Sequence, residues 1–256
     1  AVNETFDEFI SDNVIDYSKI VYDILGRTDL KMVSLYGFCN STSITIDFRN
    51  LPELEYLINQ YTSSNNIVFF GTKITKLVTN LIPNSLIGIR ELTLHNFYAD
   101  KSVFIEPNEI DRLTSFDYNI ELTRSYEYLC LTRVVIKSIR NDKPIYIKHL
   151  VLDKTQILQN QIIYVEHLEL MNKDQYCPNL ITRNITIWLN EFECSLDLNN
   201  IELDTLTLKT KDYSPFANNR KFVHNINCKT NLIKIDNGID LSDDIKRNEN
   251  VIIYTL

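Results

Sequence analysis

Apolar residues recur along most of the chain in a six-residue pattern, apolar-x-x-apolar-x-apolar. The copies are Ile89-Leu92-Leu94, Leu131-Val134-Ile136, Ile147-Leu150-Leu152, Val165-Leu168-Leu170, Leu203-Leu206-Leu208 and Val223-Ile226-Cys228, with a degenerate copy at Ile110-Leu113-Ser115. The closing apolar-x-apolar pair also occurs at Ile44-Ile46, Val68-Phe70, Ile185-Ile187 and Val251-Ile253. From residue 44 to residue 251 these pairs start on average about 21 residues apart, the length that one turn of a solenoid needs.

Alternation of period two marks each closing pair as a short strand with one face toward a core. The pattern therefore predicts an α/β or mainly β solenoid over residues 41–256, built on a parallel sheet of about 10–11 short strands. Leu150, Leu168 and Leu206 are expected to stack in one buried column. Glu169, next to Leu168, is expected on the solvent side, where its replacement by Lys would change stability by less than about 0.5 kcal/mol.

Residues 1–40 follow a different, helical spacing. Its apolar positions are Phe6, Phe9, Ile10, Val14, Tyr17, Val21 and Ile24. Thr5-x-x-Glu8 has the form of a capping box, and Gly26 stands where a helix would end. This segment is predicted to be an N-terminal helical cap that covers the apolar end of the solenoid, with a separate docking helix as the alternative.

Segments such as IRELTL, IKHLVL, VEHLEL and LDTLTL resemble the strand half of a leucine-rich repeat, over roughly residues 40–256. This resemblance implies a curved parallel sheet on a concave side and recognition of another macromolecule there. The sequence departs from the family on the other half of the motif. Its buried Asn is replaced by Phe97, Thr155, Lys173 or Lys211, so irregular repeats are expected, as in divergent members.

The residues that alternate with the buried positions predict the binding surface. On the concave face the partner-binding candidates are Arg112, Arg133, Lys137, His149, His167, Met171, Trp188 and Lys209. Trp188 is the only Trp of the chain and is expected to emerge between Met171 and Lys209, a setting typical of interface hot spots. A slip of one residue in this turn would bury it instead.

His149 and His167 occupy the same slot of consecutive turns, so they are expected to stack at about the 4.8 Å strand spacing. The slots on either side hold Arg133 and Asn184, which are poor ligands, so neither a metal site nor a cofactor is predicted. No G-x-S-x-G, P-loop, G-x-G-x-x-G or H-E-x-x-H motif is present, and no catalytic residue is predicted.

These observations favour a non-catalytic scaffold for protein–protein interaction. One alternative is a carbohydrate-active parallel β-helix, either a lyase or hydrolase or a lectin, with a glycan as ligand. A second is a structural or assembly subunit that docks through its ends or flanks. The net charge of -8 argues against nucleic acid as a partner, and no apolar run is long enough for membrane insertion.

Five cysteines without a C-x-x-C pair are typical of reduced thiols in a cytoplasmic protein. A secreted protein that has lost a signal peptide is the alternative, because the chain starts at Ala1 and carries N-glycosylation sequons at Asn3, Asn40 and Asn184.

Overall fold

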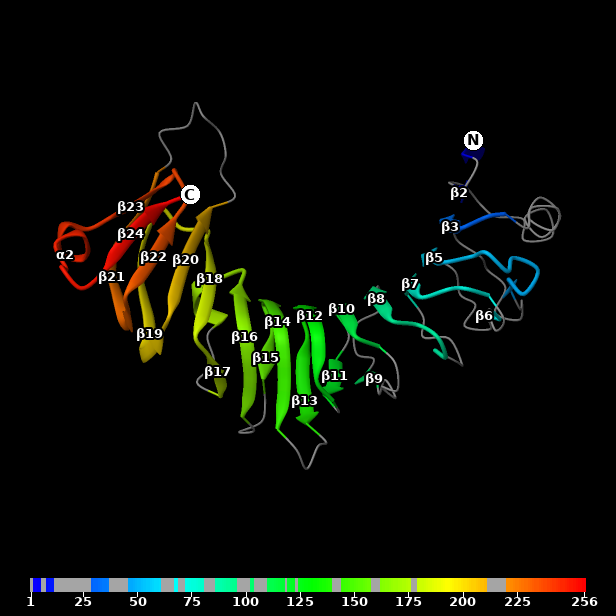
Figure 1. Cartoon of the computed structure of the whole chain (residues 1–256), viewed down its shortest axis with the longest axis horizontal. Coiled ribbons are helices and arrows are strands. Elements are labelled where there is room, and N and C mark those ends of the chain that lie inside the picture. The colour runs from blue at the N-terminus through cyan, green and yellow to red at the C-terminus, as the bar shows by residue number, and fades with distance from the viewer. Residues whose placement is uncertain are drawn as a thin grey trace. The chain divides into compact units, whose positions relative to one another are not determined.

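The computed structural model describes the chain in fifteen segments (Figure 1). These are residues 2–5, 8–11, 29–36, 46–60, 67–68, 72–80, 86–95, 102–103, 110–117, 119–122, 124–139, 144–157, 162–175, 179–210 and 220–256. The fold is mainly β, with parallel sheets that form a β-solenoid. The chain divides into two compact units, residues 1–119 and residues 120–256. The helical elements in the described segments are α2 (Asp243–Lys246) and the 3-10 helix η1 (Lys173–Gln175).

The first unit contains a main sheet whose strands follow chain order. They are β1 (Val2–Thr5), β2 (Glu8–Ser11), β3 (Met32–Tyr36), β5 (Tyr56–Gln60), β7 (Lys76–Thr79), β8 (Glu91–His95) and β10 (Arg112–Phe116). The β1–β2 pair is antiparallel and the later pairs are parallel. A separate parallel pair joins β4 (Ile46–Asp47) to β6 (Ile67–Val68), and β9 (Ser102–Val103) is a further short strand.

The second unit repeats this plan with longer strands. Its main sheet is parallel and contains β12 (Tyr126–Thr132), β14 (Ile145–Asp153), β16 (Ile163–Leu170), β18 (Asn184–Leu189), β20 (Thr205–Thr210), β22 (Leu232–Ile235) and β24 (Ile252–Thr255), with β17 (Leu180–Thr182) beside β16. Two further parallel sheets contain β11 (Asn119–Leu122), β13 (Val135–Ile139) and β15 (Gln156–Ile157), and β19 (Glu193–Leu203), β21 (Lys221–Thr230) and β23 (Ile239–Leu241).

Two columns of aliphatic side chains form the core beneath the main sheet of the second unit. The first column is Leu129, Leu150, Leu168, Ile185, Leu206 and Ile233, and the second is Leu131, Leu152, Leu170, Ile187, Leu208 and Ile235. All are buried, and neighbours within each column are partners in strand pairing. The predicted column through Leu150, Leu168 and Leu206 is confirmed.

The six-residue pattern predicts the wrong segment for two turns of this unit. Ile136 lies in β13 of a second sheet, and the main sheet instead uses Leu129 and Leu131 of β12. Ile226 lies in β21, and the main sheet uses Ile233 and Ile235 of β22. Apolar alternation occurs in both kinds of sheet, so it does not distinguish them.

The prediction for the N-terminal region is wrong in a similar way. Ile46 and Val68 lie in the small β4–β6 sheet, while the main-sheet strands β3, β5 and β7 were not recognised. The helical cap is not confirmed, because residues 2–5, 8–11 and 32–36 form strands. Most of the predicted helix, residues 12–28, lies outside the described segments.

Main-sheet strands end at corners with left-handed backbone geometry. Asp117, Arg133 and Lys154 have φ values of 62°, 54° and 50°, and each directly follows the last residue of β10, β12 or β14. Gly and Asn adopt this conformation more readily than these residues do. After the Lys154 corner, the buried Thr155 hydroxyl donates a hydrogen bond of 2.9 Å to the Leu131 carbonyl oxygen. This bond ties one turn to the turn before it.

Candidate functional site

The outward-facing residues of the second unit's main sheet form polar and aromatic ladders. Strand pairing places Tyr128, His149 and His167 in one ladder, followed by Asn184 and Thr205. The adjacent ladder contains Cys130, Val151, Glu169, Thr186 and Thr207. In the third, Trp188 is paired with Lys209. Six of these residues, Tyr128, His149, His167, Glu169, Trp188 and Lys209, are called the Glu169 cluster below.

Glu169 is the central acceptor of this cluster. Its Oε2 lies 3.1 Å from His149 Nε2, and its Oε1 accepts a hydrogen bond of 2.5 Å from Trp188 Nε1. Only 19% of its side chain is exposed. The hydrogen bond from His149, the one from Trp188 and the nearby Lys209 ammonium together lower its pKa from 4.5 to about 2. Glu169 is therefore ionised at neutral pH, and because a carboxylate only accepts, His149 carries a proton on Nε2.

Trp188 is held between this carboxylate and a cation. Its ring is half-buried, and the Lys209 Nζ lies 5.2 Å from the ring centroid, a cation–π distance. Trp188 pairs with Lys209 in the strand register that the sequence predicts, and the Trp188 side chain lies outside the core. A tryptophan fixed in this way has few alternative rotamers.

The two histidines are neighbours, but they do not stack face to face. Their ring centroids are 5.0 Å apart with an interplanar angle of 83°, and Tyr128 makes a similar edge contact with His149 at 5.4 Å. His167 Nε2 shares a hydrogen bond of 3.1 Å with the Thr186 hydroxyl. Burial, and then the neighbouring His149, lower the pKa of His167, so it is neutral at neutral pH.

The structure brings together four of the eight predicted partner-binding residues, namely His149, His167, Trp188 and Lys209. Met171 is half-buried directly after β16, and Arg112 lies on β10 of the first unit, 3.8 Å from Glu91.

Two further predicted residues also lie outside these ladders. Arg133 is exposed at a corner, and Lys137 lies on β13 in another sheet. Tyr128 takes the place in the histidine ladder that was assigned to Arg133.

Glu169 is the functional candidate that the sequence reasoning missed. Its position in the repeat could have indicated it, because Glu169 lies on the same face of the sheet as His149 and Trp188, which are on the two adjacent strands.

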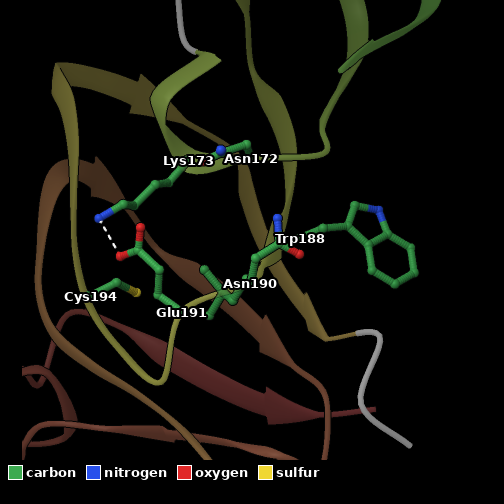
Figure 2. A pocket seen from close by; sticks show the side chains of 7 residues that line it. Asn172, Lys173, Trp188, Asn190, Glu191 and Cys194 are labelled. Atoms are coloured by element: carbon green, nitrogen blue, oxygen red, sulfur yellow. Dashed lines mark ion pairs between the residues drawn. The ribbon is translucent and has the colours of Figure 1, made fainter. Parts of the chain in front are cut away.

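A small hollow lies on the other side of the Trp188 backbone. Figure 2 shows Lys173 and Glu191, whose charged atoms are 2.7 Å apart, facing it, while the indole ring of Trp188 lies away from that ion pair. The hollow has room for about one water molecule, with a volume of about 30 Å³. Pockets for small-molecule ligands measure roughly 300–1,000 Å³, so this hollow does not suit a metabolite.

Within the described segments, no group of three or more His, Cys, Asp and Glu side chains lies close enough to bind a metal ion. No helix in these segments is long and apolar enough to cross a membrane. Comparison with protein-family models finds no match, and neither the search of curated proteins nor the search of solved structures finds one.

The lowered pKa of Glu169 gives an expected pH dependence of stability. A carboxyl group with a depressed pKa in the folded state contributes stability above its unfolded pKa of 4.5, and this contribution is lost as the pH falls toward about 2. We expect on the order of 2 kcal/mol from this residue, reduced for its partial exposure. Urea unfolding followed by circular dichroism across this pH window should show a shallower pH dependence for Glu169→Gln than for the wild type. Equal slopes for the two proteins would contradict the assignment.

Proposed function

We propose that the protein is a non-catalytic scaffold that recognises a protein partner through the Glu169 cluster. The observation that carries this proposal is a set of aromatic and charged side chains fixed by mutual contacts on the solvent face of a sheet. Trp and Tyr are enriched among the residues that dominate binding energy. Their contacts with Glu169, Lys209 and His149 restrict their rotamers before binding, which lowers the entropy that a partner must offset.

The electrostatics of Glu169 do not suit the general acid of a glycoside hydrolase. A general acid in glycoside cleavage needs a raised pKa, whereas the pKa of Glu169 is lowered to about 2. Both oxygens of its carboxylate already accept hydrogen bonds from the protein. We therefore assign Glu169 the role of a positioning residue that orients Trp188 and His149.

The relationship to leucine-rich repeats is part of the same proposal. Thr155 stands at the position of the family's buried Asn. It is buried, and its hydroxyl donates a hydrogen bond to the backbone of the preceding turn.

We also propose a cytoplasmic location, since Cys130, Cys194 and Cys228 form no disulfide among the described residues.

A phage-displayed peptide library selected on the wild-type protein tests the proposal. Trp188→Ala is expected to weaken most selected binders by about tenfold or more, because it removes the central aromatic side chain. Tyr146→Ala is the matched control, since Tyr146 is an exposed aromatic residue outside the cluster. Circular dichroism should show that both variants remain folded.

Two outcomes would contradict this proposal. Binders that tolerate Trp188→Ala but not Tyr146→Ala would place the binding surface elsewhere. Release of reducing ends from a polysaccharide, abolished by Glu169→Gln, would instead establish a carbohydrate-active enzyme.

A further inference from the structure

The outward-facing residues of three neighbouring main-sheet strands, β18, β20 and β22, carry charge of one sign. The charged side chains among them are Lys209 on β20 and Lys234 on β22, and both are half-buried. Strand pairing places Lys234 opposite Thr207, which precedes Lys209 by two residues on the same face. Two ammonium groups therefore lie on adjacent strands, next to the Trp188 side of the Glu169 cluster.

Two carboxylates lie near this lysine pair, and both are bonded within the protein. Both oxygens of Glu169 accept hydrogen bonds from side chains of the cluster. Asp236, directly after β22, is 9% exposed, and its Oδ2 accepts a hydrogen bond of 3.0 Å from the backbone N–H of Thr210. Lys209 contacts the ring of Trp188, and neither lysine forms an ion pair with another described residue. A partner that approaches this face therefore meets ammonium groups before it meets carboxylates.

This local excess of accessible positive charge differs from the charge of the whole chain. The net charge of the protein is -8. Asp153, a further acidic residue of the same face, lies at the end of β14, three strands away from β20 in the strand order. Electrostatic complementarity at such a surface favours a partner that brings negative charge to β20 and β22.

We propose that the Glu169 cluster, together with Lys234, recognises an acidic segment of a protein partner. Carboxylates of this segment bind the ammonium groups of Lys209 and Lys234, and a neighbouring apolar side chain packs on Trp188. The proposal rests on the binding role of the Glu169 cluster given above and adds the chemistry of the partner to it.

The spacing of the two lysines suits an extended segment. Their Cα atoms are separated by one strand spacing of about 4.8 Å and two residues of about 3.3 Å each, which together give roughly 8 Å. Side chains on one side of an extended chain recur about every 6.6 Å, so acidic residues two positions apart can each reach one ammonium group. Nucleic acid is a poorer match, because proteins that bind it neutralise several phosphates.

Peptides selected from the phage-displayed library on the wild-type protein test this proposal. Those that lose binding to Trp188→Ala are expected to carry acidic residues two positions apart. In fluorescence anisotropy, synthetic copies should bind the double variant Lys209→Gln, Lys234→Gln about tenfold more weakly than the wild type. The double variant Lys209→Arg, Lys234→Arg keeps both charges and should retain most of the affinity. Lys229→Gln is the matched control, since Lys229 is exposed on β21 of another sheet.

The dependence on salt is a second measurement, and it needs no variant. The affinity of the wild-type protein for the same peptides is expected to fall about tenfold as NaCl rises from about 0.05 M to about 0.5 M, because salt screens exposed charges. This result holds the proposal open to refutation even if the double glutamine variant does not fold. An affinity that does not change over this range overturns the proposal.

The outcomes separate this proposal from the one on which it rests. Peptides that depend on Trp188 but show no excess of acidic residues overturn the acidic partner and leave the binding role of the cluster intact. The same conclusion follows if they bind the double glutamine variant as tightly as the wild type. Failure to select any peptide that depends on Trp188 removes both proposals. Tighter binding of a single-stranded oligothymidylate, with the same dependence on Lys209 and Lys234, would make nucleic acid the ligand and overturn the proposal.

Discussion

Leu168→Asp is expected to destabilise the second unit by roughly 4 kcal/mol or more. Leu168 is fully buried between Leu150 and Ile185 in the aliphatic column beneath the main sheet. A carboxylate at this position would be taken out of water without a partner. Since a typical domain is stable by about 5–15 kcal/mol, this substitution removes a large share of the total.

Trp188 makes this measurement specific, because it is the only tryptophan and lies in the second unit. Urea unfolding followed by its fluorescence should show a large decrease in the midpoint for Leu168→Asp. The matched control is Ile181→Asp, which makes the same kind of change at an apolar residue that is 44% exposed, and we expect less than about 1 kcal/mol there. Equal effects of the two substitutions would be incompatible with the core described above.

Glu169→Lys is expected to cost about 2 kcal/mol. The substitution removes the acceptor for Trp188 Nε1 and His149 Nε2, and it places a second ammonium group near Lys209. Alternation along the strand alone predicts an effect below about 0.5 kcal/mol, because it identifies Glu169 only as outward-facing. The structure changes this expectation because the side chain, although outward-facing, is mostly buried by its neighbours.

Glu166→Lys is the appropriate control, since Glu166 lies on the same strand and is exposed. Urea unfolding followed by circular dichroism should separate the two variants clearly, with Glu166→Lys within about 0.5 kcal/mol of the wild type. A small effect of Glu169→Lys would show that the contacts of Glu169 with His149 and Trp188 contribute little to stability. The role of Glu169 as a positioning residue would then have to be abandoned.

The period-two pattern was sufficient to predict the solenoid and the register of most later turns. Leu92, Leu113, Leu150, Leu168, Ile185 and Leu206 all occupy the buried main-sheet positions expected from the pattern. This success has a simple cause. A strand with one buried face cannot slip by one residue without exposing its whole apolar set.

The strand positions are predicted wrongly where apolar alternation does not show at which residue the chain turns or whether a segment is helix or strand. At β12 the chain turns at Arg133 in a left-handed conformation, although Arg is not a residue that signals such a corner. The apolar residues before and after the corner, Leu131 and Val134, therefore fit one motif in the sequence, although the corner separates them. Near the N-terminus, Phe9 and Ile10 fit a helical spacing but lie in the strand β2, which pairs with β1 and β3.

The candidate site could be predicted only in part from the sequence, for a different reason. Strand pairing determines that Trp188 and Lys209 are neighbours, and the repeat spacing was sufficient to predict this. The hydrogen bonds to Glu169 join residues on adjacent strands that are offset along the sheet, and they depend on side-chain length and rotamer. Alternation contains no information about either property.

The strand order of the second unit has a consequence for how this unit folds. Within this unit, main-sheet strands that pair with each other, such as β12 with β14, β14 with β16 and β18 with β20, are one turn apart, so the paired residues are only about 20 positions apart in the chain. Closing a loop of this length has a modest entropic cost, and that cost is met separately at each turn. Folding can therefore begin at any well-paired couple of turns, such as β14 and β16, and extend in both directions without a long-range closure.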